Sequence, residues 1–479
     1  MTSKENVKTN FIFNALYQLS GVIIPLVTLP YVTRVLHANG MGEYSFAYSV
    51  AYYFYIFIRL GLHNYGNRTI AYVKDDITKL SKTFFELYAF QFFLGIGLLV
   101  LYFGYCVILS PIKSLAYIFS LVVFAGIIDI TWALYGIEEF KITSIRDIIT
   151  KTVTAVCIFI FVRGEPDVWK YSLIYSSGFF ISQAISLPIL FRKVKFIKPS
   201  LIGVRSHIKP NLVLFLPTIA VSIYKTMDKI MLGAMSEKAE LGYYHSSEKI
   251  IMVPLAFITA LGTVMLPRMS NMLSNDIDEK RIRNVFDKSI TFAMFLSTSL
   301  CMGIMSVSRE FVTVYFGEGF GKCEQLFLIV LPSCIFLAFA NVIRTQYLLP
   351  RKKDKLFIIS LFSGAAVNVL LNVALIPRYA SVGAAIGTLV AEIVVCVIQS
   401  AYVYKEANIG RNIINSIPFV ISGVVMFLAL WRYAPRVSNS VLALGVKVIL
   451  GGMCYLAVLA VLLGVKRFIG NRLNVEKTE

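Results

Sequence analysis

The chain has 479 residues, of which 57% are hydrophobic and only 15% are charged, and its mean hydropathy is +0.73. These values exclude a soluble protein of this length and predict an integral membrane protein with little sequence left for a soluble domain. The seven cysteines occur singly and the four histidines are scattered, so neither a disulfide framework nor a metal site or cofactor is predicted.

Fourteen apolar segments are long enough to cross a bilayer as helices, which predicts an all-α, polytopic membrane protein. The polar residues 1–10 precede an apolar run without a small-residue cleavage site, so we interpret the first segment as a retained span. The predicted spans are 11–33, 45–65, 84–108, 115–137, 148–162, 168–191, 211–235, 246–266, 290–307, 324–348, 356–376, 382–404, 413–430 and 441–465.

Basic residues gather in alternate connections between these spans. If the N-terminus is cytoplasmic, most of the 46 Lys and Arg fall in inner segments, which predicts that both termini lie inside. The same asymmetry explains the net charge of +19 by topology and by attraction to anionic lipid of the inner leaflet, so no nucleic-acid partner is expected.

Spans one to six and seven to twelve form two halves of similar length, joined by a long basic inner loop. We therefore predict an N-terminal lobe (1–191), a basic cytoplasmic linker (192–210), a C-terminal lobe (211–404), and two further spans with a cytoplasmic tail (405–479). The lobes are expected to be pseudo-symmetric. Gly42-Glu-Tyr44 matches Gly242-Tyr-Tyr244 at an offset of 200, and the segment from Asp129 to Tyr135 matches that from Asn341 to Tyr347 at an offset of 212.

Lys225, Asp228 and Lys229 interrupt the seventh predicted span. Each central charge costs roughly 2.5 to 3.5 kcal/mol on an insertion scale, so such a group is expected to face protein or water. Their spacing places all three on one helical face, where Asp228 can neutralise one ammonium. Lys225 is therefore a candidate contact for an anion, whereas Lys229 is expected to reach the outer surface.

Three other ionisable residues, Arg59, Arg344 and Glu392, also lie within predicted spans. Each arginine is either a cation of a polar cavity or half of an ion pair with a neighbouring carboxylate. Glu392 is either a coupling site for a proton or sodium ion or the partner of a buried cation. The candidate ion-pair partners of the arginines are Asp129, Glu138 and Glu392.

Several patches, in this order along the chain, resemble bacterial polysaccharide flippases of the O-antigen and capsule type, in the multidrug/oligosaccharidyl-lipid/polysaccharide exporter superfamily. The resemblance covers essentially the whole chain. The patches are Leu29-Pro-Tyr-Val-Thr-Arg34, Gly42-Glu-Tyr44, Gly61-Leu-His-Asn-Tyr-Gly-Asn-Arg68, Asp129-Ile-Thr-Trp132-Ala-Leu-Tyr135-Gly136-Ile-Glu138-Glu-Phe140, and Tyr224-Lys225-Thr226-Met227-Asp228-Lys229 with the following Leu232-Gly233.

This resemblance implies a flippase that moves an undecaprenyl-diphosphate-linked oligosaccharide from the inner to the outer leaflet of the bacterial cytoplasmic membrane. Its implied partners are that lipid, the membrane lipids and, as candidates, a polysaccharide polymerase and glycosyltransferases. Arg59 is similar to a cavity arginine of the lipid II flippase, and Arg34 matches another less closely. In that case Arg59, in the inner half of its span, and Lys225, in the outer half, would contact the diphosphate at successive positions.

Three alternatives remain open. A cation-coupled drug exporter of the same superfamily would have twelve spans and a more acidic cavity, and a lipid II flippase would differ around Lys225 to Lys229. A membrane polysaccharide polymerase, ligase or glycosyltransferase would need acids or arginines on a sizeable outer loop. The first outer loop here has Glu43 as its only acid, so no enzyme is predicted.

Overall fold

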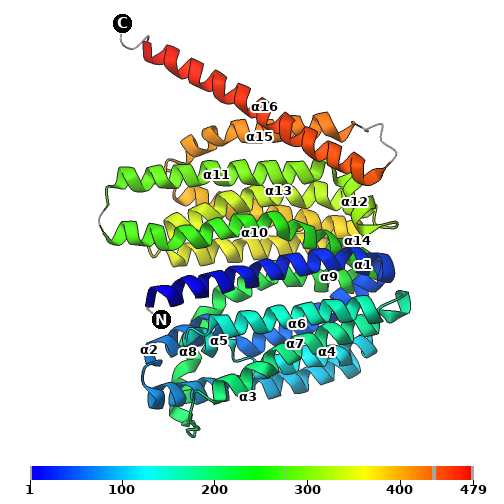
Figure 1. The fold of residues 1–479 in the computed structure, drawn as a ribbon, viewed down its shortest axis with the longest axis vertical. Helices are drawn as coiled ribbons and strands as arrows, with labels where there is room; N and C mark the ends of the chain where they lie inside the picture. Colours follow the sequence, from blue (N-terminus) through cyan, green and yellow to red (C-terminus); the bar gives the residue numbers. More distant parts are fainter. Residues whose placement is uncertain (1–2, 276, 434–438, 476–479) are drawn as a thin grey trace. The chain divides into compact units, whose positions relative to one another are not determined.

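The computed structural model describes residues 3–275, 277–433 and 439–475, and these residues form helices and short connections without a strand (Figure 1). Contacts divide the chain into two compact units, Met1–His245 and Ser246–Glu479. The division falls inside one long helix, α10. The boundaries predicted at 191, 210 and 404 stay a prediction.

The first unit contains the helices up to the beginning of α10. They are α1 (Ser3–Arg59), α2 (Leu62–Val73), α3 (Ile77–Ile108), α4 (Lys113–Ile128), α5 (Thr131–Gly136), α6 (Phe140–Phe161), the short η1 (Glu165–Asp167), α7 (Val168–Phe191), α8 (Leu201–Ser222), the π-helix η2 (Ile223–Met227), α9 (Asp228–Met235) and the start of α10 (Lys238–Ser274).

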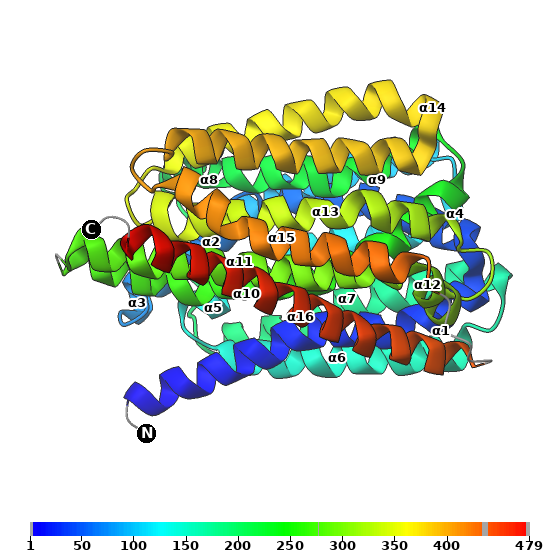
Figure 2. The ribbon, with the colours of Figure 1, turned by 90° about the horizontal axis from the view of Figure 1, so that it is seen from above.

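The second unit continues from α10. It contains α11 (Glu279–Ser306), α12 (Ser308–Phe316), α13 (Lys322–Ile343), the π-helix η3 (Arg344–Leu348), α14 (Asp354–Tyr402), α15 (Ile409–Trp431) and α16 (Ser440–Val475), which Figure 2 shows from a second direction. A buried ion pair between Lys447 of α16 and Glu310 of α12, 2.7 Å apart, fixes the last helix within this unit.

Ten helices of the described residues are long and apolar enough to cross a membrane, so the multi-pass, all-helical prediction is confirmed. These ten include twelve of the fourteen predicted spans, because α1 and α14 each contain two spans joined at a sharp corner. The corners are at His37 (φ 53°) and Ala380 (φ 48°). The predicted spans 148–162 and 211–235 are not among the ten, and both lie in helices that carry several ionisable residues.

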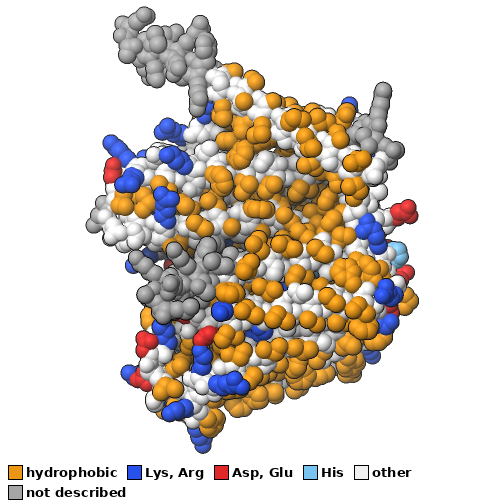
Figure 3. Space-filling view, in the orientation of Figure 1, with side chains coloured by type: hydrophobic (Ala, Val, Ile, Leu, Met, Phe, Trp, Pro, Cys, Tyr) orange, Lys and Arg blue, Asp and Glu red, His pale blue; other side chains and the backbone are white. Residues whose placement is uncertain are grey.

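Large apolar side chains cover the outer faces of the long helices, as the face in Figure 3 shows. Leu101 on α3, Leu370 on α14 and Leu428 on α15 are each more than 60% exposed. Such continuous apolar surface is unfavourable in water and is what a lipid-facing helix requires.

A break between α4 and α5 places buried polar groups in the interior of the first unit. The helix stops at Ile128, and the freed carbonyls of Gly126 and Asp129 accept hydrogen bonds from the Gln91 side chain at 2.7 and 2.9 Å. Trp132 in turn donates to the Gln91 carbonyl at 2.9 Å. A buried glutamine thus satisfies the backbone where the helix is interrupted, which a membrane interior requires.

The beginning of α10 crosses α1 with reciprocal contacts. A Cβ atom on Gly42 would lie 1.7 Å from the carbonyl oxygen of Lys238, and one on Gly242 would lie 1.8 Å from that of Ala38. The Ser45 hydroxyl lies 3.0 Å from His245 Nδ1. Ser45 and His245 are themselves 200 residues apart, and adding 200 to Gly42 and Ala38 gives Gly242 and Lys238, so the two glycine contacts are counterparts of each other.

Candidate functional site

An ion pair between Arg59 and Asp129 lies at the centre of the polar region of the first unit. Arg59 is the last residue of α1 and Asp129 occupies the break between α4 and α5; Nε of the arginine is 3.0 Å from Oδ2 of the aspartate. The Tyr55 hydroxyl accepts from Arg59 Nη1 at 2.9 Å and donates to Asp129 Oδ2 at 2.6 Å. The ion pair is one of the two roles predicted for Arg59.

Asp129 has its second oxygen occupied as well. Oδ1 accepts hydrogen bonds from the backbone N–H of Thr131, at 2.9 Å, and from its hydroxyl. The side chain is only 1% exposed, whereas that of Arg59 is 18% exposed. Both carboxylate oxygens of Asp129 are therefore paired within the protein. The Arg59 guanidinium is partly exposed, and its Nη2 lies 3.5 Å from His63 Nδ1.

A second charged group, on α6, was not among the predicted site residues. Arg146 donates through Nε and Nη2 to Asp147 Oδ1, at 3.1 and 2.8 Å, and Ser182 of α7 donates to the same oxygen at 2.6 Å. Arg146 is 5% exposed, and within the described ranges its Nη1 has no hydrogen-bond partner. Lys151 lies one turn further along α6, 4.5 Å from the centre of the Tyr17 ring.

The two charged groups belong to one polar region. Tyr17 and Tyr135 each lie near both Arg59 and the Arg146–Asp147 pair. Arg146 and Asp147 were missed because the predicted span began at 148, which placed both in an inner loop. Lys151 lay within that span and was not singled out. The i, i+4 spacing of Asp147 and Lys151 on an otherwise apolar helix was the available signal.

Arg34 and Glu138 are both exposed. Arg34 precedes the corner of α1 at His37, and its Nη1 donates to the carbonyl of Pro30 at 2.7 Å. Glu138 follows α5 and pairs with Lys74 at 2.7 Å. Of the carboxylates predicted as partners for Arg59, the structure therefore brings Asp129 to it, whereas Glu138 pairs with a lysine.

The charged cluster of the seventh span, Lys225 to Lys229, covers the end of the π-helix η2 and the start of α9. Asp228 is 1% exposed and accepts a hydrogen bond from the Tyr244 hydroxyl at 3.0 Å. The side chain of Lys225 lies outside the described residues, so its predicted pairing with Asp228 stays a prediction. Lys229 is partly buried. A π-helical turn, which is frequent at functional sites, occurs at this charged segment.

The second unit has a related arrangement around its own π-helix, η3. Arg344, the first residue of η3, donates to the Asn341 side-chain oxygen and lies 5.5 Å from the Phe357 ring centre. Asn341 donates to the carbonyl of Ile258 at 3.0 Å. Asn341 is the counterpart of Asp129 at the offset of 212, and Ile258 that of Ile58 at 200. Glu392, on α14, is 8% exposed.

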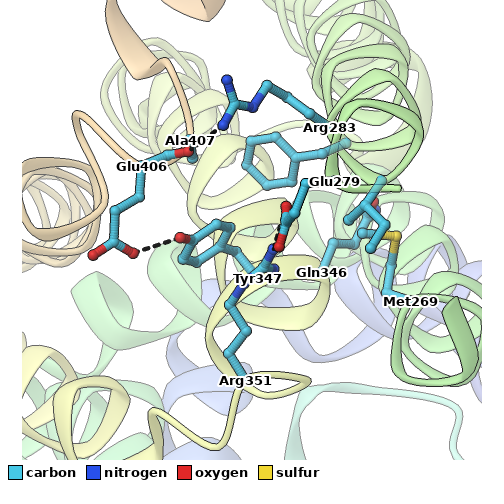
Figure 4. Close-up of a pocket in the computed structure, with 10 residues that line it drawn as sticks. Met269, Glu279, Arg283, Gln346, Tyr347, Arg351, Glu406 and Ala407 are labelled. Carbon is cyan, nitrogen blue, oxygen red and sulfur yellow. Dashed lines mark hydrogen bonds and ion pairs between the residues drawn. The ribbon is translucent and has the colours of Figure 1, made fainter. Parts of the chain in front are cut away.

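The connection between η3 and α14 is held by ion pairs, and Glu279, Arg351 and Glu406 among their members line a small pocket (Figure 4). Arg351 pairs with Glu279 at 3.1 Å, and Lys353 pairs with Glu406 at 2.8 Å. Glu406 also accepts from the Tyr347 hydroxyl. Hydrogen bonds from Lys353 and Tyr347 lower the pKa of Glu406 below its usual range.

The first unit has the same arrangement with the charges exchanged. Glu138 and Glu139, which follow α5, pair with Lys74 and Lys193 respectively. The connection after the fourth span is thus acidic and held by lysines, whereas that after the tenth is basic and held by glutamates. The match at offset 212 does not extend to these residues, because Glu139 aligns with Arg351, of opposite charge, and Glu138 aligns with Pro350.

Comparisons with known proteins agree with this architecture. The sequence model of the polysaccharide biosynthesis protein family matches residues 7–273. The putative O-antigen transporter of Escherichia coli (strain K12) is 24% identical over 410 residues, which cover 84% of this chain and 98% of that protein. The probable low-salt glycan biosynthesis flippase Agl15 of Haloferax volcanii is 25% identical over 287 residues, covering 59% of this chain and 60% of that protein.

Two solved structures share the fold. The lipid II flippase MurJ, in an inward closed conformation, superposes with a TM-score of 0.71 at 14% identity, covering 96% of this chain and 99% of that one. An inward-facing multidrug resistance MATE family transporter of the MOP superfamily superposes with a TM-score of 0.55 at 14% identity, covering 86% and 100%. Because the family match spans more than half of the sequence, the chain belongs to the polysaccharide biosynthesis protein family.

Proposed function

We propose that the protein is a flippase that moves an undecaprenyl-diphosphate-linked oligosaccharide from the inner to the outer leaflet of the bacterial cytoplasmic membrane. The observation that carries the proposal is similarity over nearly the whole length of a putative O-antigen transporter, combined with a buried, cation-rich region in the first unit. Its membrane orientation has both termini inside, as the basic residues favour.

The charges of the polar region suit a diphosphate. Arg59, Arg146 and Lys151 outnumber Asp129 and Asp147, so the region keeps a positive surplus. Coulomb attraction is several-fold stronger in a site of low dielectric than in water, and a guanidinium can bind two phosphate oxygens at once. Arg146 suits this role because Nη1 is buried with no hydrogen-bond partner in the described parts of the chain.

In this proposal the residues bind and release the headgroup without making or breaking covalent bonds. Arg59 and Arg146 would hold the diphosphate in the inner half, and Lys225 would contact it later. When the inside is negative, outward movement of negative charge is favoured by the membrane potential and releases roughly 2.3 kcal/mol per charge per 100 mV, which contributes to the driving force. Polymerase and glycosyltransferase partners are candidates that act after and before this step.

The test is deletion of the gene followed by extraction of lipid-linked oligosaccharide. We expect a complete repeat unit to accumulate on the inner leaflet, where it is protected from enzymes added outside to spheroplasts. Incomplete repeat units would point instead to an enzyme of repeat-unit synthesis, and normal surface glycan would contradict the proposal.

Complementation then tests the site. We expect Arg146→Gln to restore less than about a tenth of wild-type surface glycan, since loss of one charged hydrogen bond to phosphate costs about 1.5 to 3 kcal/mol. Arg163→Gln, an exposed arginine beyond the end of α6, is the matched control and should restore export fully. Equal export by both variants at equal membrane levels would remove Arg146 from the site.

A further inference from the structure

The connection between α7 and α8, together with the first turn of α8, presents apolar side chains beside a row of cations. Phe196, Leu201 and Ile202 are 79%, 83% and 85% exposed. Residues 192–209 contain no Asp or Glu, and their basic residues are Arg192, Lys193, Lys195, Lys198, Arg205 and Lys209. Exposed apolar groups flanked by cations are unusual on a soluble loop but typical of a segment that lies in a membrane interface.

Side-chain contacts place this connection along α3. The backbone N–H of Lys195 donates to Ser81 at 2.9 Å, and the Phe196 ring lies 5.1 Å from that of Phe85. The Ser200 hydroxyl donates to Glu86 at 2.8 Å. Glu86 lies nine residues after the start of α3, about 14 Å along its axis. The connection therefore reaches the level at which the apolar run of α3 has already begun.

The first turn of α8 is held in one orientation. Gly203 approaches so closely that a Cβ atom there would lie 1.9 Å from a Glu86 carboxylate oxygen. One turn later His207 lies 3.6 Å from Glu86 and 2.7 Å from the Tyr65 hydroxyl. Because this face of α8 is fixed to α2 and α3, the exposure of Leu201 and Ile202 is built into the fold.

We propose that residues 192–209 form an interfacial element that inserts Phe196, Leu201 and Ile202 into the inner leaflet and binds the phosphates of its anionic phospholipids. Lys195, Lys198 and Arg205 are exposed next to the apolar side chains and supply the phosphate contacts. Lys193 is engaged by Glu139 and is left out of this role. The inference rests on the inner-side placement of this connection in the proposed function.

Insertion is tested with tryptophan in full-length protein reconstituted in nanodiscs. Ile202→Trp is compared with Glu318→Trp, on the exposed connection between α12 and α13, after subtracting the signal of the three native tryptophans. We expect lipid brominated near the headgroup to quench the new fluorescence of Ile202→Trp, and acrylamide to quench mainly that of Glu318→Trp. Quenching of the Ile202→Trp variant by acrylamide alone would mean that the element lies in water, as a docking surface for a soluble protein would, and would overturn the proposal.

Lipid selectivity is tested with charge variants. The triple variant Lys195→Gln, Lys198→Gln, Arg205→Gln is compared with Lys280→Gln, Arg281→Gln, Lys288→Gln, which removes three exposed cations from α11. We expect only the first to retain several-fold less phosphatidylglycerol relative to phosphatidylcholine after purification from mixed vesicles. Equal loss of phosphatidylglycerol in both triple variants would mean that net charge alone sets lipid retention, and this would contradict a phosphate site at residues 192–209. Neither readout measures transport, so these tests can fail while the flippase function holds.

Discussion

At the scale of single residues, the polar region is determined by how each buried charge is satisfied. The Asp129 carboxylate pairs with Arg59 and accepts hydrogen bonds from Tyr55 and Thr131. The Gln91 side chain donates to the backbone carbonyl of Asp129. Leaving one partner of a buried pair unpaired costs far more than an exposed pair contributes. The residue that keeps spare hydrogen-bonding capacity is therefore more informative about binding than the residue that is fully paired.

The Arg59–Asp129 pair gives a prediction about stability. Asp129→Asn should lower the free energy of unfolding by about 3 to 5 kcal/mol, because Arg59 is then a buried charge without its counter-ion. Thermal unfolding in detergent measures the change. The double variant Arg59→Gln, Asp129→Asn should recover much of it, and Asp75→Asn, an exposed carboxylate, should have no effect. A double variant no more stable than the single one would show that the charge pair is not the cause.

Glu406 gives a prediction about pH. Its pKa is lowered in the folded protein, so its contribution to stability is complete above the usual glutamate pKa and is lost as pH falls through the lowered value. Its side chain is 52% exposed, which limits the contribution to less than about 1 kcal/mol.

A spin label at Lys352, in a background without native cysteines, should report this contact. We expect the label to be more mobile in Glu406→Gln than in wild type at pH 7, and this difference to shrink as the pH falls and Glu406 becomes protonated. A difference that does not change as the pH falls would mean that the carboxylate charge does not hold the connection. Glu324→Gln, on α13, is the matched control.

At the scale of elements, interruptions of the helices carry the polar chemistry. The α4–α5 break holds Asp129, η2 lies at the charged cluster of residues 225–229, and η3 begins at Arg344. Apolar patterning predicts that helices occupy these segments, because each span remains hydrophobic overall. The interruptions depend on partners such as Gln91, which is remote in sequence, so sequence patterning did not predict them.

The crossing of α1 and α10 gives the clearest prediction for an element. Gly42→Ala or Gly242→Ala should destabilise the protein by more than about 2 kcal/mol, because the new methyl group meets a backbone oxygen that cannot move independently of its helix. Gly97→Ala is the control, since no atom lies within 4 Å of its Cβ position. There we expect no loss, or a gain of up to about 1 kcal/mol, because alanine favours a helix more than glycine does. Equal melting temperatures for all three variants would contradict the close approach.

At the scale of the whole molecule, function depends on orientation in the membrane. With the N-terminus inside, residues 162–168 lie outside and residues 192–210 inside. Alkaline phosphatase fused after Gly164 should therefore be active, and a fusion after Lys195 should be inactive. Green fluorescent protein should fluoresce when it is fused after Lys195 and should not fluoresce when it is fused after Gly164. The reverse pattern would overturn the assignment of both termini to the cytoplasm and, with it, the inner-leaflet element.

The sequence by itself determined the helical membrane class, the positions of most spans and the family, because hydropathy and local motifs do not depend on distant contacts. It also identified Arg59 and Asp129 as candidate partners. Only the tertiary structure paired them, buried Arg146 without a partner for Nη1 among the described residues, and placed Gly42 against the backbone of α10. Each of these outcomes depends on atoms that are far apart along the chain, and burial and pairing of a charge are properties of the space around it.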